Sequence, residues 1–97
     1  MRYVLFVTFS EPADAVLSKA SADCYSIHRA RMDKPHARGT LLMAGAFRDP
    51  QNPLSTMGIF TTREAAEDFA RADPFVLSGL ASRWEVREWN DVLAEQT

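Results

Sequence analysis

Apolar and polar positions in the first forty residues predict a strand followed by a long helix. Residues 3–9 are rich in aromatic and β-branched side chains and stop at Ser10-Glu11-Pro12, as a strand does before a turn. From Ala13 to about Met32, apolar side chains recur every three or four positions, the spacing of one face of an amphipathic helix. These positions are Leu17, Ala20, Cys24 and Ile27. Pro35 and Gly39 are expected to end the helix.

The second half predicts two strands, a helix and a last strand. Residues 40–47 and 54–60 are short apolar runs separated by turn-forming residues, which indicates neighbouring strands. Thr61 with Glu64 matches a capping box, so a helix is expected to begin there. Its inner face would carry Ala65, Ala66, Phe69 and Ala72. Residues 82–89 alternate apolar and charged side chains and predict a strand with Trp84 and Val86 on one side.

The resulting order, strand–helix–strand–strand–helix–strand, predicts one α+β domain over residues 1–97 with a ferredoxin-like fold and a four-stranded antiparallel sheet. Two helices cover only one face of such a sheet, whereas the first three strands carry apolar residues on both faces. A second copy of the sheet is the simplest cover for the other face. We therefore expect a homodimer.

A short helix is predicted to begin after Asp73, and this aspartate is the first candidate catalytic residue. Asp73 would cap the helix, Pro74 would take its first position and Gly79 would end it. On the longer helix, His28 follows Cys24 by four residues and therefore lies at the edge of the apolar face. A His28–Asp73 pair could hold one imidazole tautomer for proton transfer. The structural alternatives are a simple cap and a core histidine bonded to a carbonyl.

Composition and charge argue against several classes of function. A net charge of −2 without a basic cluster argues against nucleic-acid binding. No apolar run is long enough to cross a bilayer, and residues 1–9 are too short for a secretory signal. The lone Cys24 fits a reducing compartment and a buried thiol, so a cytoplasmic location is expected. His36, the second of two histidines, leaves too few ligands for a common metal site. No cofactor motif is present.

Two segments combine several short motifs. The first is His28-Arg29-Ala30-Arg31-Met32 followed by Arg38-Gly39-Thr40-Leu41-Leu42-Met43-Ala44-Gly45, and the second is Glu64-Ala65-Ala66 followed by Ala72-Asp73-Pro74-Phe75 and Gly79-Leu80. Together they resemble the YCII-related family. The resemblance implies a ferredoxin-like fold that assembles as a dimeric α+β barrel, with a histidine and an aspartate thought to be catalytic. His28 and Asp73 occupy those positions. One branch of the family removes HCl from a chlorinated hydroxyhydroquinone.

The chain also departs from the family pattern. Gly45-Ala46 stands where the family often has Gly-Pro, and a family serine near the start of the third strand maps onto Ser55. The family's arginine shortly before the histidine is missing, so Arg31 is the candidate to hold a substrate anion. Phe75 is a candidate apolar wall for a flat ligand, and Tyr25, three residues before His28, is a candidate polar contact.

Three functions remain open from the sequence. The first is a cofactor-free enzyme in which His28 and Asp73 transfer a proton on a small cyclic or aromatic molecule, in an elimination or isomerisation. The second is a module that binds a metabolite without converting it. The third is a cofactor-free monooxygenase.

Overall fold

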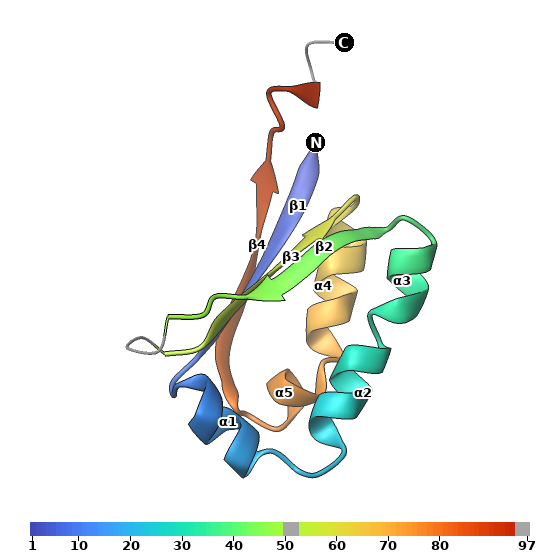
Figure 1. Cartoon of the computed structure of the whole chain (residues 1–97). Helices are drawn as coiled ribbons and strands as arrows, with labels where there is room; N and C mark the ends of the chain where they lie inside the picture. Colours follow the sequence, from blue (N-terminus) through green and yellow to red (C-terminus); the bar gives the residue numbers. More distant parts are fainter. Residues whose placement is uncertain (50–52, 95–97) are drawn as a thin grey trace.

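The computed structural model describes residues 1–49 and 53–94 and shows a four-stranded antiparallel sheet with helices packed on it (Figure 1). The elements in chain order are β1 (Arg2–Phe9), α1 (Ala13–Lys19), α2 (Cys24–Ala30), α3 (Asp33–Ala37), β2 (Leu41–Ala46), β3 (Ser55–Phe60), α4 (Arg63–Arg71), α5 (Pro74–Leu77) and β4 (Ala81–Trp89). The strand order is β2-β3-β1-β4. This is the expected ferredoxin-like α+β arrangement, because β1 lies centrally between β3 and β4.

The core lies between the sheet and the helices. On β1, Leu5, Val7 and Phe9 alternate with residues of the other face and are all buried in one apolar cluster. Phe60 of β3 and Ala66 and Ala70 of α4 complete the centre of this cluster. Trp84 and Val86 pack against it from β4 as expected. The small alanines let α4 approach the sheet closely.

The helix expected over residues 13–32 is instead divided into α1 and α2, with α3 following from Asp33, which is a correction to the sequence analysis. Ala20 has extended backbone angles and ends α1. The carbonyl of Ser21 then accepts a hydrogen bond from the Cys24 amide (3.1 Å), which starts the next helix. Serine and aspartate in residues 20–23 favour such turns over helix interiors.

The division also changes which residues face the core. Val16 and Cys24 are buried, whereas Leu17 and Ile27 of the expected apolar face are about half exposed. Pro35 lies inside α3 rather than ending a helix, since proline is tolerated in a first turn. Gly39 has a φ of +76° and does end α3 as expected.

Helix α4 begins one residue later than the capping box indicates. The Thr61 amide bonds the Thr40 carbonyl (2.9 Å), so Thr61 is held by the chain that enters β2. Thr62 is the cap, and its hydroxyl accepts from the Ala65 amide (3.2 Å). Ala72, expected on the inner face, is exposed, and Ala70 is buried in its place.

The sheet face opposite the helices is apolar near its centre. Val4 of β1 pairs with Ile59 of β3, and both are buried although neither belongs to the helix-side cluster. Phe6 and Met57 form the next pair along the same two strands. Within the described part of the chain, no helix is long and apolar enough to cross a membrane.

Candidate active site

A cleft of about 900 Å³ lies between the β2–β3 hairpin and the helices α1–α3. The strands present small side chains to it, because Ala44, Ala46, Thr56 and Gly58 lie on the helix side of the sheet. A Cβ at Gly58 would approach Phe60 Cε2 to 3.2 Å, so this position is tight on the core side. Small residues on the strands therefore keep the space between sheet and helices open.

His28 and Asp73 meet at the inner wall of this cleft. Nδ1 of His28 lies 3.1 Å from Oδ1 of Asp73, and the Asp73 residue is only 2% exposed. Burial of Cys24 seats α2 on the core, and one helical turn later this places His28 beside the start of α5. The sequence analysis proposed this pair, and the structure brings the two side chains together.

Asp73 acts as both a helix cap and the partner of His28. Its Oδ1 accepts a hydrogen bond from the Phe75 amide (3.0 Å), the bond expected of a cap at α5. The same oxygen faces the imidazole. The cap thereby fixes where the carboxylate stands relative to His28.

Two phenylalanine rings surround the imidazole. The ring centroids of His28 and Phe75 are 5.0 Å apart at 74°, and those of His28 and Phe69 are 6.3 Å apart at 66°. Both are edge-to-face contacts. The Phe69 and Phe75 rings exclude water from the His28–Asp73 contact, and the attraction between the two side chains is therefore stronger than in an exposed pair.

The contact with Asp73 selects the imidazole tautomer. An ionised carboxylate only accepts hydrogen bonds, so Nδ1 of His28 carries the proton and donates it. In the neutral ring, the lone pair is then on Nε2. The arrangement can therefore present a basic nitrogen to a molecule in the cleft.

Two other candidate residues line the same cleft. Phe75 is buried in its wall against His28, and Tyr25 lies on the same helix as His28 with more than half of its surface exposed. Tyr25 thus stands at the solvent side of the cleft and Phe75 at its inner side.

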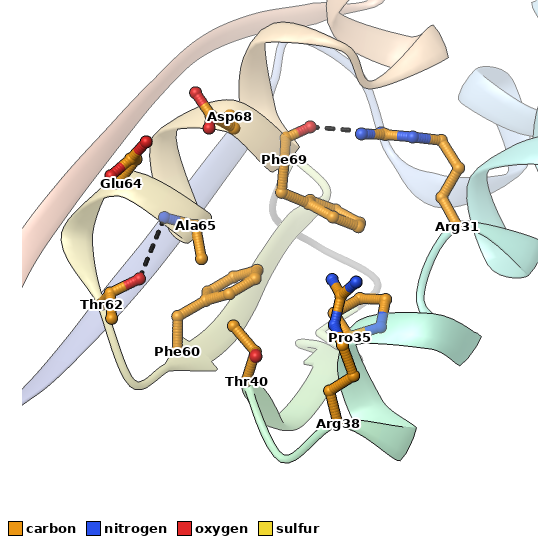
Figure 2. A pocket seen from close by; sticks show the side chains of 10 residues that line it. All are labelled: Arg31, Pro35, Arg38, Thr40, Phe60, Thr62, Glu64, Ala65, Asp68 and Phe69. Carbon is orange, nitrogen blue, oxygen red and sulfur yellow. Dashed lines mark hydrogen bonds between the residues drawn. The ribbon is translucent and has the colours of Figure 1, made fainter.

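Arg31 and Ser55 do not line the cleft. Ser55 pairs with Thr8 of β1 and lies on the face opposite Thr56, which is the β3 hydroxyl in the cleft. Arg31 donates from Nη1 to the Phe69 carbonyl (3.2 Å), and its guanidinium lies 4.6 Å from the Phe69 ring centroid. Figure 2 shows Arg31 at a second, smaller pocket.

The sequence analysis missed His36, Thr56 and Phe69 as site residues. His36 of α3 lines the cleft, and its Nδ1 donates to the Leu41 carbonyl (3.0 Å). The sequence analysis did not place His36 on a helix beside the cleft, because the helix was expected to end at Pro35. The alternation Leu54, Thr56, Gly58 along β3 was visible in the sequence, but its register with β1 was not.

Cys24 is buried near the pair, and burial raises the pKa of its thiol, with a smaller contribution from the negative charge of Asp73. A raised pKa favours the protonated thiol and argues against a nucleophilic role. The buried, protonated Cys24 thiol makes its full contribution to the free energy of unfolding below the pKa of an unfolded thiol, about 8.5. This contribution is lost as the pH rises through the pKa of the thiol in the folded protein.

Replacing Asp73 with asparagine is expected to lower the pKa of the Cys24 thiol while leaving it above its usual range. Asparagine caps a helix about as well as aspartate and lacks the charge, so burial remains as the main cause. The ultraviolet absorbance of the thiolate, followed against pH in both proteins, measures the change. Identical thiol titrations in the two proteins would show that the charge of Asp73 does not affect the pKa of Cys24.

Among the described residues, no group of three or more histidine, cysteine, aspartate or glutamate side chains is placed to hold a metal ion. The residues around His28 that could contact an organic ligand are instead aromatic and hydroxyl side chains, Phe69, Phe75, Tyr25 and Thr56.

Comparisons with known proteins agree with this fold. The chain resembles the structure of 5-chloro-2-hydroxyhydroquinone dehydrochlorinase (TftG) from Burkholderia phenoliruptrix, which was solved in complex with 2,5-dihydroxybenzoquinone. The TM-score is 0.66 at 16% sequence identity, and the match covers 93% of this chain and 94% of TftG. At this identity the likeness shows a shared fold. A comparison with curated proteins finds no match. The model of the YCII-related domain matches residues 1–90, and the chain therefore belongs to the YCII-related family.

Proposed function

We propose that the cleft is the active site of a cofactor-free enzyme that transfers a proton on a small cyclic or aromatic substrate, in an elimination or isomerisation. The observation that carries the proposal is the contact of His28 Nδ1 with the buried Asp73 carboxylate at 3.1 Å, at the wall of a ring-lined cleft. A histidine held in this way is suited to general acid–base catalysis near neutral pH.

In the proposed mechanism, the lone pair on His28 Nε2 accepts a proton from the substrate. The imidazolium that forms keeps its Nδ1–H bond to Asp73, whose negative charge stabilises it. In an elimination, the electron pair of the broken bond to hydrogen forms a double bond as an anionic leaving group departs. In an isomerisation, the imidazolium returns the proton to another atom.

The walls of the cleft support a flat apolar substrate with polar substituents. Phe69 and Phe75 flank His28, while Thr56 and Tyr25 offer hydroxyl groups from the strand and helix sides. TftG shares this fold and was solved with a quinone ring, 2,5-dihydroxybenzoquinone. We therefore propose hydroxylated rings, including chlorinated ones, as the first substrates to test.

The direct test follows proton transfer and chloride release together. The protein is incubated with 5-chloro-2-hydroxyhydroquinone and with unchlorinated hydroxyquinols in deuterated water. Chloride is measured by electrode, ring deuteration by NMR, and oxygen uptake in parallel. Catalysed chloride release or solvent deuterium incorporation supports the proposal.

Other outcomes identify the alternative functions. Saturable binding with every ligand recovered unaltered and undeuterated would contradict catalysis and favour a metabolite-binding module. Oxygen uptake coupled to substrate loss would favour a monooxygenase instead. A cytoplasmic location and the absence of a cofactor stay predictions from the sequence.

We also propose that two copies pair through the helix-free faces of their sheets. Phe6 and Met57 are partly exposed beside the buried Val4–Ile59 pair, and a second sheet on this face would remove their apolar surface from water.

Sedimentation equilibrium is expected to return the mass of a dimer at micromolar concentration. Replacing Met57 with lysine places a charge in the proposed contact and is expected to shift the protein toward the monomer. Leu77→Lys, at an exposed leucine of α5, is the matched control and should leave the dimer intact. A monomer that persists at high concentration would contradict the pairing.

A further inference from the structure

A second pocket of about 420 Å³ lies between α3 and α4, where the start of β2 meets the end of β3 (Figure 2). Its apolar surface comes from Pro35, Phe60, Ala65 and Phe69. Around this surface stand Arg31, Arg38 and Thr40. None of these polar side chains takes part in the proposed chemistry at His28.

Two rings separate this pocket from the cleft. Phe60 and Phe69 line both cavities, and their centroids lie 5.6 Å apart. Arg31 holds Phe69 in place by bonding its carbonyl and stacking over its ring. The two cavities are thus neighbours that share a wall.

The backbone places Arg38 and Thr40 firmly at the pocket edge. Thr40 donates its amide to the Pro35 carbonyl (2.9 Å) and accepts from the Thr61 amide (2.9 Å), while the Arg38 amide bonds Lys34. Gly39 between them takes the positive φ that closes α3. Arg38 and Thr40 are therefore held at fixed backbone positions on both sides of this turn.

The guanidinium of Arg38 has hydrogen-bond donors that a ligand could use. This group makes no ion pair or hydrogen bond with any side chain or carbonyl in the part of the chain that the structure describes. Figure 2 shows it alongside Pro35, on the same side of the pocket as Arg31. Arg38 and Thr40 both line this edge of the pocket, and a planar guanidinium together with a hydroxyl suits a carboxylate, which can accept two parallel N–H bonds from the guanidinium.

Two carboxylates restrict the charge of a ligand. Glu64 and Asp68 line the α4 side of the pocket, and Figure 2 shows their side chains directed away from both guanidinium groups. Asp68 also lies 3.7 Å from Arg71. A second negative charge on a ligand would add to the repulsion from these two carboxylates, whereas an apolar body would cover Phe69, Pro35 and Ala65.

We propose that this pocket is a second ligand site, which binds small aromatic monocarboxylates. The carboxylate bonds Arg38 and the Thr40 hydroxyl, and the ring packs on the partly exposed Phe69, Pro35 and Ala65. The site goes beyond the proposed proton transfer and does not require it.

Benzoate is the probe, titrated into the whole protein and followed by NMR. We expect saturable shifts at the amides of Gly39, Thr40 and Ala65. The Phe69 ring should also shift, but it borders both cavities and does not by itself assign the site. Benzyl alcohol, which lacks the charge, and inorganic phosphate, which lacks the apolar body, are each expected to bind at least about tenfold more weakly.

Arg38→Gln is expected to weaken benzoate binding by about tenfold or more, because it removes the charge at an exposed position without disturbing the core. Arg29→Gln is the matched control, since Arg29 lies at the other cleft and pairs with Asp33 (3.1 Å). Unchanged binding in Arg38→Gln, shifts confined to Thr56 and Gly58 in the cleft, or no saturable binding would each overturn the proposal. All readouts are independent of catalysis at His28.

Discussion

Replacing His28 with glutamine is expected to lower turnover by about 100-fold or more, the contribution typical of a general base. Glutamine keeps a polar side chain of similar length beside Asp73 but has no basic nitrogen at neutral pH. The substrate is a ring molecule identified by the deuterium or chloride assay, and the initial rate is compared at saturating concentration. We expect the loss in kcat rather than in KM, because the proton is transferred in the chemical step.

His36→Gln is the comparison that assigns this loss to one imidazole. Both histidines line the cleft, but His36 is held by the neutral Leu41 carbonyl and His28 by a carboxylate. The loss in His28→Gln should exceed that in His36→Gln by at least about tenfold. Equal losses, with both variants folded by circular dichroism, would remove the special role of the His28–Asp73 pair.

Replacing Phe60 with alanine is expected to cost about 3–5 kcal/mol of the free energy of unfolding. Phe60 is 1% exposed and lies at the centre of the helix-side core, where it supports Phe69. Truncation would also remove part of the wall that the cleft and the second pocket share. Chemical denaturation monitored by tryptophan fluorescence measures the change.

Phe47→Ala removes the same atoms at a side chain that is 52% exposed, and its expected cost is within about 1 kcal/mol. Similar costs for the two variants would contradict the placement of Phe60 in the core. If Phe60→Ala fails to fold, Phe60→Leu tests the same point with a smaller expected loss.

The sheet and the short capped helix could be predicted from the sequence because their signals are local. A run of aromatic and β-branched residues marked β1, short apolar runs marked β2 and β3, and alternating apolar and charged residues marked β4. Asp73-Pro74 with Gly79 marked α5. The division of residues 13–37 into three helices could not be predicted, because the helical spacing of apolar residues, with Leu17 and Ile27, continues across the bends. The positions of the bends depend on how Val16 and Cys24 pack in the core.

The His28–Asp73 contact was accessible from the sequence through the family resemblance, since it joins two residues 45 positions apart. The placement of Ser55 and Arg31 was not. The face on which Ser55 lies depends on its register against Thr8, and a shift of one residue exchanges the two faces. The direction of Arg31 depends on where the Phe69 carbonyl becomes available on α4.

The bend at residues 20–23 makes one wall of the cleft adjustable. Helix α2 is held to the core by Cys24 and by the imidazole–carboxylate contact, whereas Val16 is the one buried residue of α1. A short irregular link joins the two helices. Insertions or deletions in that link would tilt α1 and widen or narrow the cleft mouth near Leu17 without moving the strands. A change in the length of this link would therefore alter the width of the cleft mouth and leave His28 and Asp73 in place at the inner wall.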